Sequence, residues 1–171
     1  RLGADFIKKF AFDESGRAFF RLTQDGKPIN KPWSIFSETF LIIGLAHYAK
    51  ASGDELSLEQ AVKTYWNLVS LLDNPEKIGS NTVYENYPVK GHAIPMIMVA
   101  TTQELREIVP DDRYQPVMKK YLGEILWVHA RDDVQALLEN VNSDGSMIPG
   151  PEGRCVNPGH AIESAWFCLR E

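Results

Sequence analysis

The stretch "SETFLIIGLAHYAKASGDELSLEQAVKTYWNLV", residues 37–69, decides the fold class. Its first part is a run of apolar and small residues that ends at Gly53, a typical helix C-terminus. Its second part opens with Ser57-x-x-Gln60, the pattern of a capping box, and continues with apolar residues at helical spacing. The stretch therefore predicts two consecutive helices, the first apolar on most sides and the second amphipathic.

The same contrast between two kinds of helix returns further along the chain. The stretch "HAIPMIMVATTQELREIV", residues 92–109, is strongly apolar, whereas residues 111–130 alternate apolar and charged side chains at helical spacing. Apolar helices that alternate with amphipathic ones predict an all-α fold with a buried inner layer and a half-exposed outer layer. An α/α toroid and an ordinary helical bundle both fit, and spacing alone does not choose between them.

The remaining segments predict shorter elements. Residues 1–12 have helical spacing, and residues 16–30 form a hairpin around Asp25-Gly26. Residues 76–91 are a polar connection, residues 134–154 contain strands and turns, and a last helix starts at Pro158. We expect a single domain over 1–171. Because both ends cut through helical patterns, we expect it to be a fragment of a longer domain.

Composition and charge exclude several classes of protein. A net charge of −5 without a basic patch argues against a nucleic-acid partner. The longest apolar run, residues 40–46, is too short to cross a membrane, and the first residues lack a signal-peptide pattern. Two cysteines, Cys155 and Cys168, favour reduced thiols over a disulfide framework. These features predict a cytoplasmic protein.

Metal and nucleotide motifs are missing from the sequence. The spacing Cys155-x4-His160-x7-Cys168 fits no zinc pattern and lacks a fourth ligand, so no metal is expected. The glycine-rich residues 150–154 lack the lysine and the strand-loop-helix setting of a phosphate-binding loop.

The last helix carries the clearest candidates for chemistry. His160 lies in its first turn, Glu163 follows one turn later, and Trp166 and Phe167 share that region of the helix. Glu163 and Glu38 both stand in apolar helical surroundings. Because an unpaired buried carboxylate is costly, each needs a partner or a substrate.

Five ordered stretches cover nearly the whole chain: "GRAFFRLTQDGKPI", "SIFSETF", "HAIPMIMV", "LLENVNSDGS" and "GRCVNPGHAIESAWFCL". Together they resemble the N-acylglucosamine 2-epimerase family, which is also known in mammals as renin-binding protein. The resemblance implies an (α/α)6 barrel with a sugar site in its mouth. Members of this family are more than twice as long, so the chain resembles the central part of the barrel, with short β-hairpins in its loops.

The resemblance implies epimerisation at the sugar carbon next to the carbonyl, for example between N-acyl-D-glucosamine and N-acyl-D-mannosamine. His160 lies in the family motif "NPGHxxE" and is expected to be a general acid/base, with Glu163 either orienting its ring or binding sugar hydroxyls. Four further residues are expected to contact the sugar: Glu38, His92, Glu139 and Trp166.

The resemblance also implies features outside these residues. A second catalytic histidine is expected beyond Glu171 and a sugar-binding arginine before Arg1, so the fragment alone is expected to be inactive. The chemistry requires no cofactor, and the resemblance implies ATP as an activator rather than a phosphoryl donor. The expected partner is a small sugar, without nucleic acid or membrane, and a homodimer is allowed.

Three alternatives stay open at this stage. The same barrel serves aldose-ketose isomerases and cellobiose 2-epimerases. A binding or regulatory protein would keep the barrel without the chemistry. A glycoside-cleaving relative would need two carboxylates across the bond, and Glu38 and Glu163 are the pair to consider.

Overall fold

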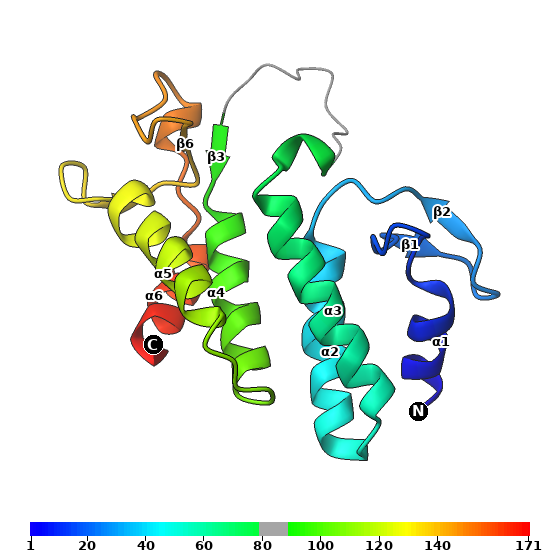
Figure 1. Ribbon diagram of the computed structural model, residues 1–171. Coiled ribbons are helices and arrows are strands. Elements are labelled where there is room, and N and C mark those ends of the chain that lie inside the picture. Colours follow the sequence, from blue (N-terminus) through cyan, green and yellow to red (C-terminus); the bar gives the residue numbers. More distant parts are fainter. Residues whose placement is uncertain (79–88) are drawn as a thin grey trace. The chain divides into compact units, whose positions relative to one another are not determined.

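The computed structural model describes residues 1–78 and 89–171 (Figure 1). The contacts divide the chain into two compact units, and the single domain over 1–171 stays a prediction. The first contains Arg1–Glu85 with Glu107–Pro110, and the second contains Asn86–Arg106 with Asp111–Glu171. Most of the predicted connection over residues 76–91 lies outside the described residues.

The first unit is built on two helices joined by a short turn. Its elements are α1 (Leu2–Phe10), β1 (Arg21–Leu22), β2 (Pro28–Asn30), α2 (Phe36–Ser52), α3 (Glu55–Leu72) and the 3₁₀ turn η1 (Pro75–Lys77). Helices α2 and α3 lie side by side, and α1 contacts both (Figure 1). The hairpin of β1 and β2 turns at Asp25-Gly26, as the sequence predicts.

Helices α2 and α3 pack through stripes of residues at helical spacing. The buried residues include Ile42, Leu45, Ala46 and Ala49 on α2 and Ala61, Thr64, Tyr65 and Leu68 on α3. Within this unit α2 buries only one face, because Phe40 on its other side is 64% exposed. The amphipathic character predicted for α3 is confirmed.

The turn between α2 and α3 confirms one predicted cap and corrects another. Gly53 ends α2 in the left-handed conformation, at φ 74°, which favours glycine. The prediction that Ser57 caps α3 is wrong, because α3 begins at Glu55 after the N-cap residue Asp54. The Ser57 hydroxyl instead donates to the Asp54 carboxylate at 2.8 Å, and Lys8 donates to the same oxygen at 2.5 Å.

A buried ion pair between Arg17 and Glu38 holds the segment before β1 against α2. Glu38 is 1% exposed, and its Oε1 accepts hydrogen bonds from Arg17 Nε at 2.7 Å and from the Ala18 backbone N–H at 2.9 Å. The other guanidinium nitrogens donate to the carbonyl oxygens of Ser34 and Ile78. The buried carboxylate thus has a protein partner.

We expect Glu38→Ala to lower the free energy of unfolding by about 3–5 kcal/mol, because the Arg17 guanidinium is then left buried and unpaired. Urea unfolding followed by circular dichroism measures the change. The matched control is Lys27→Ala, which removes an exposed partner 2.9 Å from Asp25 and is expected to leave the stability almost unchanged. Equal losses of unfolding free energy in the two variants would show that the buried Arg17 guanidinium does not need Glu38 as its partner.

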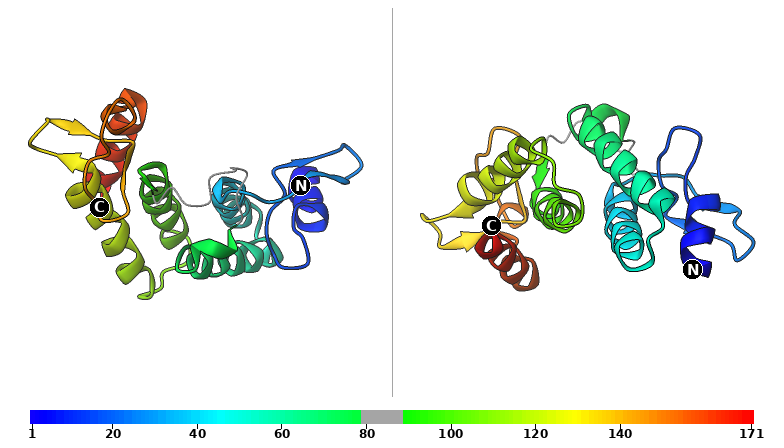
Figure 2. Two further views of the ribbon diagram at one scale, coloured as in Figure 1. Left: turned by 90° about the horizontal axis from the view of Figure 1, so that it is seen from above. Right: turned by 60° about the horizontal axis from the view of Figure 1, so that its bottom comes forward.

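The second unit surrounds one buried helix. Its elements are β3 (Val89–Gly91), α4 (Ala93–Arg106), α5 (Tyr114–Glu124), the π-helical turn η2 (Ile125–His129), β4 (Ala130–Arg131), β5 (Ala136–Leu137), β6 (Asn140–Asn142), the 3₁₀ turn η3 (Glu152–Arg154) and α6 (Pro158–Arg170). Every residue of α4 from Pro95 to Gln103 is buried, as predicted for an inner helix. Helices α5 and α6 both pack against it (Figure 2).

Polar contacts fix α6 against the far end of α4. Gln103 donates to the carbonyl oxygen of Phe167 at 2.9 Å, and both terminal nitrogens of Arg106 donate to Glu171, each at 2.7 Å. In a further ion pair the cation comes from α6 and the anion from α4, because Arg170 pairs with Glu104. The orientation of α6 therefore depends on its polar contacts with the last residues of α4.

A short antiparallel ladder brings the start of α4 beside a distant loop. Strand β3, which the sequence did not predict, pairs with β6 so that Val89 faces Asn142 and Gly91 faces Asn140. The next backbone pair continues the ladder, because the N–H of His92 donates to the carbonyl oxygen of Glu139 at 2.8 Å. Two polar residues 47 positions apart are thereby placed side by side.

Candidate active site

His160 lies in the first turn of α6, and a helix cap fixes its backbone. The Asn157 side chain accepts hydrogen bonds from the backbone N–H groups of Gly159, at 3.0 Å, and His160, at 3.4 Å. Pro158 occupies the first helical position, as predicted. The cap was not predicted, although asparagine is a preferred N-cap residue. The imidazole side chain is 34% exposed, so a substrate can reach it.

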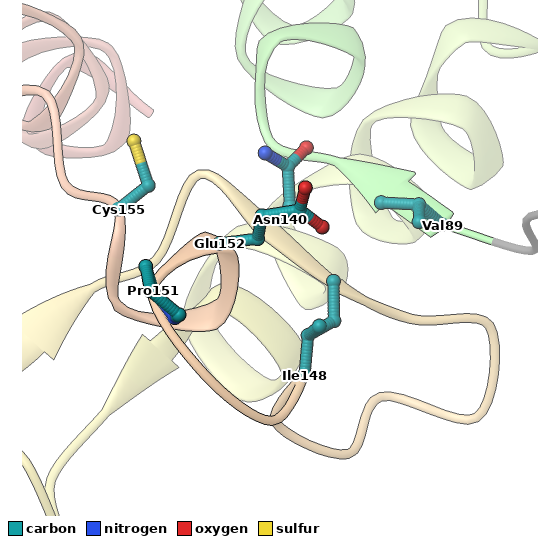
Figure 3. A pocket seen from close by; sticks show the side chains of 6 residues that line it. All are labelled: Val89, Asn140, Ile148, Pro151, Glu152 and Cys155. Carbon is teal, nitrogen blue, oxygen red and sulfur yellow. The ribbon is translucent and has the colours of Figure 1, made fainter.

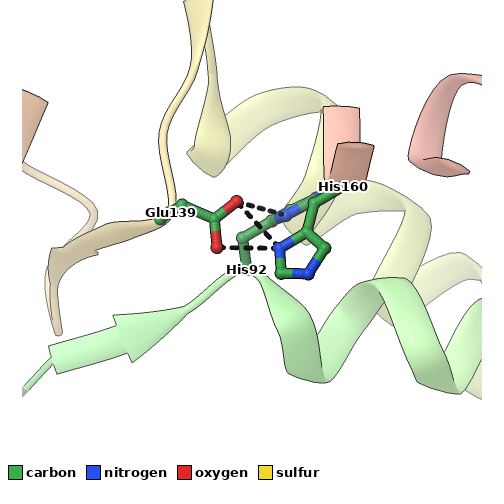
Figure 4. Close-up of side chains that lie close together, drawn as sticks. All are labelled: His92, Glu139 and His160. Carbon is green, nitrogen blue, oxygen red and sulfur yellow. Dashed lines mark hydrogen bonds and ion pairs between the residues drawn. The ribbon is translucent and has the colours of Figure 1, made fainter. Parts of the chain in front are cut away.

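Glu139 orients the His160 ring (Figure 4). Its carboxylate oxygens lie 3.0 and 3.1 Å from His160 Nδ1, and its side chain is only 15% exposed. Because a carboxylate only accepts hydrogen bonds, Nδ1 carries the hydrogen and donates it. The neutral ring then has its lone pair on Nε2. This is the arrangement of a histidine prepared to accept a proton.

His92 lies behind Glu139 and is fully buried. Its Nε2 lies 2.8 Å from the Ser164 hydroxyl, and its Nδ1 lies 3.6 Å from Glu139 Oε1. Burial lowers the pKa of His92 to about 4, with a further lowering from His129 and an opposing effect from Glu139. The ring is therefore neutral near pH 7. Because none of its surface is exposed, this geometry supports a role in positioning Glu139 rather than the predicted sugar contact.

A second buried histidine, His129, stands beside His92, with 5.4 Å between the ring centroids. Its Nδ1 donates to the carbonyl oxygen of Leu138 at 2.9 Å, which ties the π-helical turn to the residue before Glu139. Burial lowers its pKa, and the Leu138 carbonyl opposes this effect. Sequence reasoning did not assign His129 to the site. The structure places it at the C-terminus of the π-helical turn η2, and π-helical turns are frequent at functional sites.

Glu163 and Trp166 lie on the exposed side of α6. Within the described part of the chain, Glu163 makes no hydrogen bond with His160. The predicted role of orienting the His160 ring is filled by Glu139 instead of Glu163. The carboxylate of Glu163 stays accessible to sugar hydroxyls. Trp166 is 58% exposed, and its ring lies 5.0 Å from that of Phe167.

Glu38 belongs to the first unit, where Arg17 binds it. The predicted lining of a sugar cavity by Glu38 is therefore not supported by its surroundings, because the carboxylate is buried and paired with a cation. The same pairing disfavours Glu38 as one of two carboxylates in a glycoside-cleaving site, since a general acid must reach the bond that it protonates.

A hollow of about 520 Å³ lies between β6 and η3 (Figure 3). Its lining residues are Val89, Asn140, Ile148, Pro151, Glu152 and Cys155. Asn140 directly follows Glu139 in the sequence, and the Glu139 N–H donates to the carbonyl oxygen of Cys155 at 3.0 Å. The loop that forms this hollow thus also holds the backbone of Glu139.

Gly153 is the residue on which this loop depends most. A Cβ atom at this position would lie 1.7 Å from the carbonyl oxygen of Ile148 and 2.6 Å from its carbonyl carbon. Both are backbone atoms, so a side-chain rotation cannot relieve the clash.

We therefore expect Gly153→Ala to cost about 1–3 kcal/mol or more of unfolding free energy. Gly44→Ala, on an exposed part of α2 with open space around it, is the control and is expected to stabilise by up to about 1 kcal/mol. Urea unfolding measures both variants. Wild-type stability in Gly153→Ala would contradict the close approach of Ile148.

The cluster of His92, Glu139 and His160 was only partly predicted. Each offers a ligand-type atom, and these atoms lie within 4.8 Å of one another, close enough to hold one metal ion. Sequence analysis expected sugar contacts from His92 and Glu139 and did not predict that either would meet His160.

In the described part of the chain, no helix is both long and apolar enough to span a bilayer.

Comparison with known proteins identifies the relatives of this chain. The family model for N-acylglucosamine 2-epimerase matches residues 1–170. N-acylglucosamine 2-epimerase of Mus musculus is 28% identical over 179 residues, which cover 99% of this chain and 42% of that protein. The Homo sapiens protein of the same name is 29% identical over 175 residues, covering 99% and 41%. The chain thus spans about two fifths of the length of these relatives.

Solved structures with the same fold are also sugar epimerases. A sugar epimerase from a ruminal bacterium superposes with a TM-score of 0.76 at 21% identity, over 95% of this chain and 44% of that chain. Cellobiose 2-epimerase from Bacillus thermoamylovorans gives 0.76 at 14% identity, over 95% and 45%. The predicted fold class, part of an all-α (α/α)6 barrel with short hairpins, is confirmed. The chain belongs to the N-acylglucosamine 2-epimerase family.

Proposed function

We propose that this chain is part of a sugar 2-epimerase and that His160 is one of its proton-transfer groups. The reaction is the interconversion of N-acyl-D-glucosamine and N-acyl-D-mannosamine. The observation that carries the proposal is the contact of His160 Nδ1 with both oxygens of the mostly buried Glu139. Membership of the family adds support, because the named relatives are N-acylglucosamine 2-epimerases.

The geometry fits proton abstraction next to a carbonyl. In the open-chain sugar, the hydrogen on C2 is acidic because its loss gives an enediolate, in which the charge reaches the carbonyl oxygen. His160 Nε2 accepts that proton, and the imidazolium that forms is stabilised by Glu139 at Nδ1. Return of a proton to the opposite face inverts C2. A second acid or base must supply that proton.

Contacts behind the reacting ring support its role. Glu139 is mostly buried, and its carboxylate faces nitrogens of both His160 and His92, so water competes weakly for its oxygens. His92 Nε2 lies 2.8 Å from the Ser164 hydroxyl on the second turn of α6, so the residue behind Glu139 contacts the helix that also carries His160. A histidine ring whose partner is fixed in this way needs little reorganisation when its charge changes.

Substrate contacts are proposed for the exposed residues of α6. The Glu163 carboxylate can accept hydrogen bonds from sugar hydroxyls, and the exposed Trp166 ring offers an apolar surface for one face of a sugar. Glu163 lies three positions after His160 on one helix, so a sugar bound at one of them lies within reach of the other.

ATP and location are finer parts of the proposal. The glycine-rich residues 150–154 lack the lysine of a phosphate-binding loop, so activation by ATP is proposed from the family resemblance alone. A cytoplasmic location is supported by Cys155 and Cys168, which are both free thiols.

A cellobiose 2-epimerase is the second candidate. The match of the fold to a solved cellobiose 2-epimerase favours it, and the same proton transfer at C2 would act on the reducing sugar of a disaccharide. The two candidates share His160 and differ only in the sugar.

The proposal is tested with the full-length protein in D₂O. Proton NMR follows the C2 hydrogen of N-acetylmannosamine, mannose and cellobiose in parallel, with and without ATP. Exchange of that hydrogen with the formation of the C2 epimer is the expected result, and the fastest sugar identifies the substrate. Sugar or protein binding without exchange would indicate a regulatory protein, and release of glucose from cellobiose would indicate a hydrolase.

A further inference from the structure

The cluster of His92, Glu139 and His160 contains an unexplained buried nitrogen. His92 is fully buried, and in the described part of the chain its Nδ1 has no hydrogen-bond partner. The nearest acceptor, Glu139 Oε1, is 3.6 Å away, which is too long for a hydrogen bond. Figure 4 shows Nδ1 of His92 directed at the Glu139 carboxylate, and an unpaired buried nitrogen at this distance is open to an ion as its partner.

The other nitrogen of His92 indicates what that group can be. Nε2 lies 2.8 Å from the Ser164 hydroxyl. When Nε2–H donates to this hydroxyl, the lone pair of Nδ1 faces the negative charge of Glu139, and a cation between them removes the repulsion. Metal-binding histidines commonly donate their second N–H to a neighbouring oxygen in this manner.

We propose that His92 Nδ1, Glu139 and His160 Nδ1 form a binding site for a divalent transition-metal ion such as Zn²⁺ or Co²⁺. Bonds of about 2.0–2.2 Å place tetrahedral ligands about 3.4 Å apart. The separations of 3.6 Å from His92 Nδ1 and 3.0 Å from His160 Nδ1 to Glu139 bracket this value. The three ligand atoms lie within 4.8 Å of one another, so small side-chain movements bring them around one ion. Two imidazoles and one carboxylate suit zinc and its neighbours better than magnesium or calcium.

The bound ion acts as an inhibitor, and this part rests on the proposed function. When Nδ1 of His160 binds the metal, the neutral ring carries its single hydrogen on Nε2. The lone pair that would accept the C2 proton is then absent. The metal takes the place of the hydrogen that Nδ1 otherwise donates to Glu139, so metal binding and proton transfer exclude each other.

Binding is tested independently of activity on the full-length protein freed of metal with EDTA. Titration with Co²⁺ is followed by visible absorption, and titration with Zn²⁺ by calorimetry. We expect one ion per chain and a Co²⁺ spectrum typical of four-coordinate nitrogen and oxygen ligands. Glu139→Gln is expected to abolish it. Ser164→Ala, which keeps all three ligands, is expected to weaken binding by about 10–100-fold.

The control is His47→Gln, which removes an exposed imidazole on α2 and should leave the affinity unchanged. Circular dichroism establishes that each variant is folded, and Ser164→Ala decides the matter if Glu139→Gln does not fold. Absence of Zn²⁺ binding, or binding that survives both variants, would overturn the proposal. Stoichiometric binding without loss of C2 exchange would keep the site and refute the inhibition, whereas absence of exchange before metal is added would refute only the proposed function.

Discussion

Replacing His160 with glutamine is expected to slow C2 proton exchange by about 10²–10⁴-fold in the full-length protein, because glutamine cannot accept a proton. The fold should survive, since the Asn157 cap binds the backbone N–H of residue 160 and not its side chain. The ring is one third exposed, so little packing is lost. Loss of the C2 hydrogen signal in D₂O measures the rate, and thermal unfolding establishes that the variant is folded.

The matched control is His47→Gln, an exposed histidine on α2 that lies outside the cluster. It should retain the wild-type rate of exchange. A His160→Ala variant sharpens the test, because it leaves space at a half-exposed position that free imidazole can enter. Partial recovery of exchange with added imidazole would show that a base is missing. A His160→Gln rate within tenfold of the wild type would assign the proton transfer elsewhere.

Local patterns predicted several elements of the fold, including the helix that carries His160. Gly53 ends α2, Asp25-Gly26 forms the hairpin turn and Pro158 starts α6, each at the expected position. These features depend on the conformational preferences of a few neighbouring residues, which the sequence states directly. The same local preferences did not decide where α3 begins. Asp54, three residues before Ser57, is also a preferred N-cap residue type, and Lys8 from another helix binds its side chain.

The partner of His160 was beyond what these patterns show. Glu139 is fixed by backbone hydrogen bonds to His92, at the end of the β3–β6 ladder, and to Cys155, shortly before α6. Strand β3 is only the three residues Val89, Lys90 and Gly91, without an alternating pattern. The nearest carboxylate along the helix, Glu163, was therefore the natural candidate. Long-range pairing by a short strand leaves almost no local signal.

The cost of burying a carboxylate predicted that Glu38 needs a partner but did not identify it. The partner is Arg17, which lies 21 residues earlier and also donates to two backbone carbonyl groups. The sequence left open whether the partner of Glu38 is a protein group or a sugar, and the partner is a cation within the fold. The free-energy cost of burying a charge thus indicates that the group is paired, whereas only the fold identifies its partner.

Glu139→Gln is expected to lower kcat for epimerisation by about 10²–10⁴-fold with little change in KM. Loss of the partner carboxylate from a catalytic histidine has a cost of this size, because the amide stabilises neither the required tautomer nor the imidazolium. Glutamine can present its NH₂ group to Nδ1, and the hydrogen of the ring then moves to Nε2. The side chain of Glu139 is mostly buried, so a direct contribution to sugar binding should be small.

Glu163→Gln is the matched comparison, because it removes the same charge from the exposed side of α6. We expect it to raise KM through lost hydrogen bonds to sugar hydroxyls and to leave the His160 tautomer unchanged. Imidazole ¹⁵N NMR reads the tautomer directly: the hydrogen should stay on Nδ1 in Glu163→Gln and leave it in Glu139→Gln. The reverse pattern, with the tautomer and kcat lost only in Glu163→Gln, would return the orienting role to Glu163 and leave Glu139 a purely structural contact.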